Sequence, residues 1–475
     1  MTRDTSMLAA ALVVLLAGCL GSAGPAPHAR HPGTLTCLGP CLGVIPEPGS
    51  KNAVFEPVVA VDPQNENHII IAAMVTDSGS DAATCANIGT PYLCANIHYH
   101  MTTDGGASWT SSEIPHGPNA GPNHPLAEAT ATYDPRLGFL PDGTILLEGR
   151  GLNSASASTS SGIGFATGTA RGERIFSARS TDGGRTFTDF VIISQGDGVL
   201  VPGPSPSDAE GSTIAGHQVE EEAFSIAPDG TILTVWTNIT ATLGEEASAL
   251  MMWSVSRDGG RTWAAAHTMP GTAKRVAPYD ALITQEGTWI VAFLQWSGAA
   301  TGGNPGDYEA WVARSADQGK TWGTKEIGAA TWFPAVTQDG SLLVYAFPAR
   351  NDDHTFTPSV TISQDDGGSF APVHPLDAPQ PWAATVTMIA GRNASVALYY
   401  GTDPEGSAHE LRAVAVGTDW VSVPLVVEAH GTQAADALGD YFGLASTSGG
   451  AVAVWPDIGG EPAIHWARLH VLIPE

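Results

Sequence analysis

Basic residues are scarce in this sequence. The chain of 475 residues has 48 Asp and Glu but only 20 Lys and Arg, and its formal net charge is −28. A surface with this excess of negative charge repels phosphate groups, which argues against nucleic acids as partners. It also argues against a protein held on a membrane surface by electrostatic attraction.

Helical periodicity is lacking as well. After about the first 20 residues no segment sustains the i, i+3, i+4, i+7 apolar pattern, which argues against a helical bundle or a doubly wound α/β enzyme. Apolar residues still make up 43% of the chain, with 13 Trp, 13 Phe and 9 Tyr, so a core can form. Length alone suggests about three domains, but all-β architectures exceed that rule.

The N-terminus has the pattern of an export signal. Arg3 precedes an apolar run, Met7–Ala17, that is too short to span a bilayer, and Leu16-Ala17-Gly18-Cys19 follows. This end resembles the lipobox of prokaryotic lipoproteins, which implies a signal peptide over 1–18 and a diacylglycerol on Cys19. The protein would then be exported and anchored to the outer face of the cell membrane, its only membrane contact being that lipid. An ordinary signal peptide with an incidental Cys is the alternative.

The next segment, residues 19–50, is rich in Pro, Gly, Ala and His and is expected to be a tether. The remaining cysteines are Cys37, Cys41, Cys85 and Cys94. In an exported chain four cysteines favour two disulfides, and of the three possible pairings we expect Cys37–Cys41 and Cys85–Cys94. A metal site is the weaker alternative, because the spacings are not those of a zinc finger.

One short pattern recurs five times: Ser/Thr, any residue, Asp, any residue, Gly, any residue, Ser/Thr, aromatic. The copies have their aspartates at Asp104, Asp182, Asp258, Asp317 and Asp365. Glycine supplies positive φ and the carboxylate can accept backbone N–H bonds, so each copy is expected to be a hairpin turn. Calcium binding is disfavoured, because each copy offers one regularly placed carboxylate where calcium prefers six or more oxygens. We therefore expect no cofactor, with a structural Ca²⁺ as the open alternative.

This pattern is identified as the Asp-box, or bacterial neuraminidase repeat, and the chain resembles the sialidase superfamily of β-propellers. The resemblance implies an all-β propeller over 51–475 built from four-stranded antiparallel blades. Apolar strand pairs around a Gly turn recur seven times, for instance around Pro141-Asp142-Gly143 and Pro228-Asp229-Gly230. Seven blades are therefore predicted, with six as the alternative, and a strand near 45–56 is expected to close the ring.

The resemblance also implies a site, on the face opposite the Asp-boxes. Sialidases hold an acidic sugar with three Arg and use a Tyr nucleophile, a partner Glu and an Asp acid/base. Here Tyr441 in Asp440-Tyr441-Phe442-Gly443 resembles the nucleophile strand, and Glu221 stands where the partner would. Arg150 and Arg350 are the two plausible arginines.

The chain departs from the family pattern at three points. Tyr133 or Asp134 replaces the leading Arg, and the loop 151–169 contains no Asp. The strand end Trp236-Thr237-Asn238 has no Arg. These departures argue against sialidase activity, so whether the protein is an enzyme stays open.

Each candidate also has an ordinary structural interpretation. Tyr441 can be a packed strand aromatic, and Glu220-Glu221-Glu222 can be a solvated strand start, a set of carboxyls with raised pKa values, or a cation ligand. Further candidates share a position near strand-one starts or strand-two ends, where aromatic rings and carboxylates suit sugar binding. They are Asp280, Trp296, Trp332, Trp382 and Asp457.

Three functions remain open at this point. The preferred hypothesis is a lipid-anchored, non-catalytic binding or scaffold protein at the cell surface, with a glycan or other extracellular polymer as ligand. The second is an exo-acting glycoside hydrolase that uses Tyr441 and Glu221. The third is a platform for protein assembly on the rim of the propeller.

Overall fold

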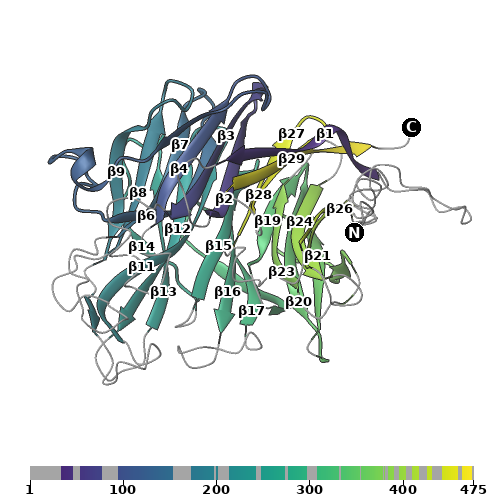
Figure 1. Ribbon diagram of the computed structural model, residues 1–475. Helices are drawn as coiled ribbons and strands as arrows, with labels where there is room; N and C mark the ends of the chain where they lie inside the picture. The colour runs from purple at the N-terminus through teal and green to yellow at the C-terminus, as the bar shows by residue number, and fades with distance from the viewer. Residues whose placement is uncertain are drawn as a thin grey trace, which may run out of the picture.

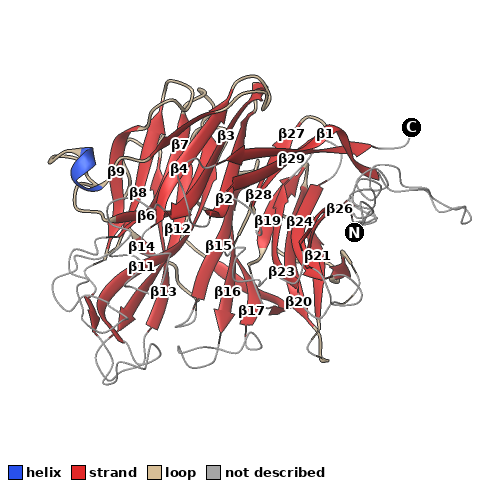
Figure 2. Cartoon of the chain, viewed as in Figure 1, coloured by secondary structure: helices blue, strands red, loops and turns tan. Residues whose placement is uncertain are grey.

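The computed structural model describes residues 34–46, 54–76, 95–152, 173–196, 199–201, 213–241, 248–272, 276–296, 308–330, 333–353, 355–377, 379, 383–389, 395–402, 409–416, 425–430, 441–457 and 463–472. These residues form β-strands and one short 3₁₀ helix, η2 (Gly117–Ala120), as Figure 2 shows. Within these ranges no helix has the length and apolar character needed to cross a membrane. The prediction of an all-β protein is confirmed.

The strands form six antiparallel sheets. Three of the four-stranded sheets follow chain order: β2 (Val54–Asp62), β3 (Asn65–Thr76), β4 (Ala95–Thr102) and β5 (Thr110–Glu113); β6 (Ala131–Phe139), β7 (Ile145–Leu152), β8 (Arg174–Ser180) and β9 (Thr188–Gln195); β23 (Ala383–Ile389), β24 (Ser395–Thr402), β25 (His409–Val416) and β26 (Leu425–His430). A five-stranded sheet holds β10 (Val199–Val201), β11 (Thr213–Ile226), β12 (Ile232–Ala241), β13 (Ser248–Ser256) and β14 (His267–Thr268).

The eight-stranded sheet consists of two four-stranded units, in which the last strand of the first unit pairs with the end of the second strand of the other. The first unit is β15 (Val276–Ile283), β16 (Trp289–Trp296), β17 (Tyr308–Ser315) and β18 (Gly323–Ala330). The second is β19 (Ala335–Asp339), β20 (Leu342–Arg350), β21 (Phe356–Ser363) and β22 (His374–Pro375). One residue pair, Ala330 with Ala349, joins β18 to β20.

The last sheet joins the two ends of the described chain. β27 (Gly443–Thr447), β28 (Gly450–Pro456) and β29 (Ala463–Leu472) pair in order, and β1 (Thr34–Pro46) pairs with β29. Figure 1 shows β1 in purple beside β29 in yellow. The closing strand thus lies at 34–46, inside the segment expected to be a tether, and not near 45–56. Residues from Val54 onward pair with β3 in the next sheet, so they are not available to close the last one.

The first strands of the units contact one another in a cycle. β2 contacts β6, β6 contacts β11, and the series continues through β15, β19, β23 and β27 back to β2. A radial ring of sheets requires this order, because each blade packs its inner strand against the next. The contacts are those that seven blades would make, and the blade count itself stays a prediction.

Strands in the middle of a sheet are apolar on both faces. In β3, Ile69 and Ile71 pack in one cluster with Val452 of β28, whereas Ile70 packs in another with Ile145 of β7. Alternate side chains of β3 therefore enter two different sheet interfaces, which explains a continuous apolar run where a two-layer sandwich would show alternation. Each isoleucine buried in this way contributes about 2 kcal/mol.

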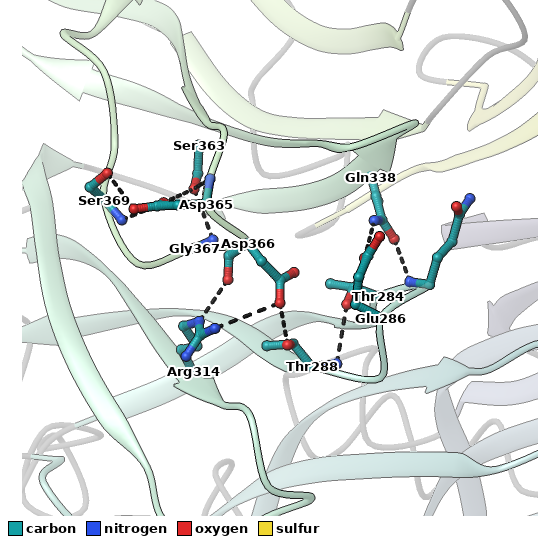
Figure 3. Close-up of polar contacts among 11 residues, drawn as sticks. Thr284, Glu286, Thr288, Arg314, Gln338, Ser363, Asp365, Asp366, Gly367 and Ser369 are labelled. Atoms are coloured by element: carbon teal, nitrogen blue, oxygen red, sulfur yellow. Dashed lines mark hydrogen bonds and ion pairs between the residues drawn. The ribbon is translucent and has the colours of Figure 1, made fainter.

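The Asp-boxes form the turns between third and fourth strands. In the box at 363–370, the Ser363 hydroxyl donates to Asp365 Oδ1 (2.8 Å) and accepts from Gly367 N–H (2.8 Å). Ser369 donates its N–H to Asp365 Oδ1 and its hydroxyl to Oδ2, both at 2.7 Å. Gly367 has φ 83°, which a residue with a Cβ rarely adopts. Figure 3 shows this closed network.

The aromatic residue that ends each box packs against another strand or unit. Trp263 donates its indole N–H to Ser177 Oγ of β8 (3.0 Å). Phe187, in the previous box, meets the Tyr99 ring of β4 edge-on, with centroids 4.9 Å apart. The box therefore closes its own hairpin and also ties neighbouring units together.

Further polar contacts join the units at the Asp-box end. Arg314 donates from Nε to the Asp366 carbonyl (2.6 Å), and the Thr288 hydroxyl donates to Asp366 Oδ2. Gln338 donates to Glu286 (2.8 Å). Figure 3 shows these side chains converging between the two halves of the eight-stranded sheet. Because neighbouring strands are antiparallel, the starts of first strands lie at the opposite end.

Candidate functional site

A cavity of about 350 Å³ lies among the first strands, in the channel that they surround. Much of its wall is apolar, from residues such as Val58 and Phe224. Its polar lining comes from separate strands and is Arg136, Ser225, Tyr279, Asp280, Thr337 and Tyr441. The channel can therefore enclose a small ligand or one unit of a larger one.

Several first strands carry a β-bulge near this channel. The register shifts between Phe55 and Val58 in β2 and between Tyr133 and Arg136 in β6. Two of the residues skipped by these shifts, Glu56 and Asp134, have φ of 52° and 53°. A non-glycine residue in this conformation is strained, and such residues concentrate at functional sites.

Tyr441 immediately precedes Phe442 and β27 at the edge of this cavity. The Arg136 guanidinium carbon lies 4.0 Å from the centroid of its ring, a cation–π contact. The hydroxyl is buried and has no hydrogen-bond partner among the described residues. Burial raises the pKa of Tyr441 well above its usual value; Arg136 opposes this, and the charges of Glu56, Asp134 and Glu222 add to it. We call these five residues the mouth; of them, Arg136 and Tyr441 line the cavity.

Arg150, on β7, is held by the protein's own acids. Its Nη1 pairs with Asp134 Oδ2, and its Nη2 lies 3.1 Å from Glu173 Oε1. Nη2 also donates to Tyr133 Oη (3.3 Å), and the Tyr133 hydroxyl donates to Glu173. Only 9% of the Arg150 side chain is exposed. The expected ligand-binding arginine is thus the centre of an internal ion-pair network.

Two further carboxyls lie near Arg136, one half-buried and one fully buried. Asp280, at a bulge in β15, accepts from Ala281 N–H and Val336 N–H, both at 2.9 Å, and so connects β15 to β19. Burial raises the pKa of Asp280 to about 7 despite these bonds. Glu148 of β7 is fully buried and accepts from the Thr234 hydroxyl (2.8 Å), and burial raises its pKa to about 8.

Glu221 stays a prediction as the partner of Tyr441, and the glutamate next to it, Glu222, is the one whose position the structure describes. Glu221 is the bulge residue of β11, between Glu220 and Glu222, and its side chain lies outside the described residues. The Glu222 side chain is fully buried, and its charge acts on Tyr441. A bulge shifts the alternation of side chains, so spacing alone cannot choose between adjacent glutamates.

The other predicted residues are spread around the ring. Arg350 is half-buried at the end of β20, outside the described lining of the cavity. Asp457 lies 3.8 Å from His465 Nε2. Trp332, Trp382, Cys19, Cys85 and Cys94 lie outside the described residues, as do the side chains of Trp296, Cys37 and Cys41.

Sequence reasoning missed Arg136 and Glu56, and it named Glu222 only as one of three adjacent glutamates. One signal could have found the first two: Phe55-Glu56-Pro57 and Tyr133-Asp134-Pro135-Arg136 repeat an aromatic–acid–Pro motif in consecutive first strands. Among the described side chains, no group of three or more His, Cys, Asp or Glu could hold a metal ion. The possible structural Ca²⁺ is untested.

Comparison with known proteins finds a family model that matches part of the chain. Residues 204–414 match the family model of the BNR repeat-like domain. This match supports the BNR-repeat fold that the Asp-boxes predict. No curated protein sequence matches the chain.

Solved structures resemble this BNR-repeat protein at low identity. A protein of unknown function from Dyadobacter fermentans is 15% identical with a TM-score of 0.50, over 92% of this chain and 99% of that one. The Hadza microbial sialidase Hz136 is 14% identical with a TM-score of 0.46, over 79% of this chain and 74% of that one. Trypanosoma rangeli sialidase is 11% identical with a TM-score of 0.41, over 71% of this chain and 54% of that one.

Proposed function

We propose that this BNR-repeat protein is a non-catalytic binding protein whose channel mouth takes a polyhydroxylated ligand, a glycan or a similar extracellular polymer. The observation that carries the proposal is the channel cavity, which joins an apolar wall to Arg136, Asp280 and Tyr441. Sugars present both hydroxyls and C–H faces, so they match a site with carboxylates, aromatic rings and apolar side chains. The buried Tyr441 hydroxyl has no hydrogen-bond partner among the described residues, so it would gain a bond from a ligand hydroxyl that entered beside it.

Binding is favoured over hydrolysis because the groups needed for catalysis are engaged or not activated. A tyrosine nucleophile needs a lowered pKa or an adjacent base, whereas burial raises the pKa of Tyr441. Arg150 is paired with Asp134 and Glu173.

Two assays on the same protein separate the hypotheses. We expect no turnover of a fluorogenic sialoside, and binding to a subset of neutral glycans on an array. Tyr441→Phe should weaken that binding by about fivefold, since one hydrogen bond contributes about 1 kcal/mol. Tyr99→Phe is the matched control, because the Tyr99 hydroxyl donates to the Arg185 carbonyl beside an Asp-box.

Each of the other outcomes of these assays would favour one of the alternative hypotheses. Sialoside turnover abolished by Tyr441→Phe would establish the glycoside hydrolase. Neither turnover nor glycan binding, together with a stable protein partner in pull-downs, would favour the assembly platform.

We also propose that the protein is exported and lipid-anchored at Cys19. Palmitate labelling in a bacterial host should be lost in Cys19→Ser, and the protein should then leave the membrane fraction. Labelling that persists in this variant would refute the anchor.

A further inference from the structure

Asp134 forms an ion pair with Arg150, an arginine that was expected to bind the ligand. This inference rests on the proposed function, because it concerns the ligand that the mouth accepts. Arginine is the residue best suited to bind a carboxylate, through two parallel N–H bonds. Here the Arg150 guanidinium already has Asp134 on Nη1 and Glu173 on Nη2. A carboxylate ligand would have to displace a carboxylate that belongs to the protein.

The backbone holds Asp134 in this position at a cost. Asp134 lies in the bulge between Tyr133 and Arg136 and has φ 53°. Aspartate and asparagine adopt this region more readily than other residues with a Cβ, so an asparagine in this position keeps the backbone conformation. Its side chain is 17% exposed, which places the charge at the boundary with solvent. This backbone conformation therefore accompanies an ion pair that occupies the Arg150 guanidinium, so that Arg150 has less capacity to bind a ligand.

The mouth as a whole has an excess of negative charge. Glu56, Asp134 and Glu222 all act on the Tyr441 hydroxyl, and Arg136 is the cation that opposes them. Arg136 is itself engaged, because its guanidinium lies over the Tyr441 ring and donates from Nε to the Glu222 carbonyl (3.0 Å). An anionic ligand at the mouth would meet repulsion, because Arg136 and Arg150 are both engaged by protein groups, whereas an ammonium or a hydroxyl would meet acceptors.

We propose that Asp134 sets the charge of the ligand: by holding Arg150 and adding its own charge beside Tyr441, it excludes carboxylate-bearing sugars and admits neutral and amine-bearing ones. Specificity of this kind comes from a repulsive element as much as from an attractive one. The test looks for a gain of binding to carboxylated sugars, because a variant that is only misfolded would lose binding and not gain it.

The experiment uses the whole chain and an array of neutral glycans beside their sialylated or uronic-acid counterparts. Wild-type protein should bind neutral or amine-bearing glycans and reject the carboxylated ones. Asp134→Asn keeps the size of the side chain and suits the positive φ, and it releases Nη1 of Arg150. We expect about tenfold or greater gain in affinity for carboxylated counterparts, with neutral binding changed by less than about twofold. The gain should shrink at high salt, where charges are screened.

Asp366→Asn is the matched control. Asp366 also has positive φ (56°) and pairs with an arginine, with Arg314 Nη2 at 3.6 Å, but it lies at the Asp-box end. It should leave both ligand classes unaffected. If Asp134→Asn does not fold, Glu173→Gln releases the other side of Arg150 and should give a gain of the same sign.

The outcomes distinguish this inference from the proposed function. Neutral binding in wild type without any gain in either variant overturns the role of Asp134 and leaves the binding function standing. Wild-type binding of carboxylated glycans as tight as that of neutral ones also overturns it. Absence of all glycan binding, in wild type and variants alike, overturns both.

Discussion

Glu148 gives a prediction in which a substitution inside the core should stabilise the protein. Its side chain is fully buried in β7, and the described partner of the carboxyl is the Thr234 hydroxyl. Burial raises its pKa from the ordinary 4.5 to about 8, with Thr234 and Arg136 opposing the change. Between these two pH values the folded protein keeps a proton that the unfolded chain has released. Stability must therefore fall as the pH rises from 4.5 to 8.

The size of the penalty follows from the pKa change. One pKa unit corresponds to about 1.4 kcal/mol, so at pH 7 the buried carboxyl costs about 3 kcal/mol of unfolding free energy. That is a large share of the roughly 5–15 kcal/mol that stabilises a typical protein. Glu148→Gln cannot ionise and keeps an oxygen for Thr234, so it should remove the penalty.

Urea denaturation at several pH values measures the effect. Glu148→Gln should be more stable than wild type by about 3 kcal/mol at pH 7, by more at pH 8.5, and by almost nothing at pH 4.5. Glu326→Gln, an exposed site on β18, should show no such pH dependence. A Glu148→Gln effect that is the same at pH 4.5 and pH 8.5 would refute the reasoning.

Two further predictions concern the framework. Asp365→Ala should destabilise the protein above about pH 4. The hydroxyl and N–H of Ser369 and the Ser363 hydroxyl hold the pKa of Asp365 at about 2. The stabilisation by the Asp365 carboxylate is therefore present above the ordinary pKa of 3.8 and is lost as the pH falls toward 2. Acid titration of the melting temperature tests this, and an equal deficit at pH 2 and pH 7 would contradict it. Gly443→Ala should lower stability by about 1–3 kcal/mol, because a Cβ there would lie 2.8 Å from Val58 Cα and 2.6 Å from Val454 Cγ2. Denaturation by urea measures the loss, and an unchanged midpoint would mean that β27 and β2 do not approach so closely.

The repeated turns could be predicted from the sequence because their chemistry is local. In the box at Asp365 the network of Ser363, Gly367 and Ser369 closes within seven residues. The closing strand could not be placed in the same way. The pairing of β1 with β29 joins Thr34 to Leu472, and no local pattern specifies a partner so distant.

The candidate site shows the same division. Tyr441 was found from its strand, but its neighbour Arg136 lies 305 positions earlier in the numbering and meets it only through the ring. Arg150 was expected to bind a ligand, but in the structure it forms ion pairs with Asp134 and Glu173. The sequence can identify a charged residue at a strand end, but it cannot say which residue of opposite charge forms an ion pair with it.

By itself, then, the sequence determined the all-β class, the Asp-box turns and the end of the sheets that carries them, since each depends on residues within hydrogen-bonding reach along the chain. Only the tertiary structure decided which strand closes the ring, which glutamate acts on Tyr441 and which arginines are already neutralised. Those outcomes depend on bulges that shift the alternation of side chains and on contacts between strands hundreds of residues apart.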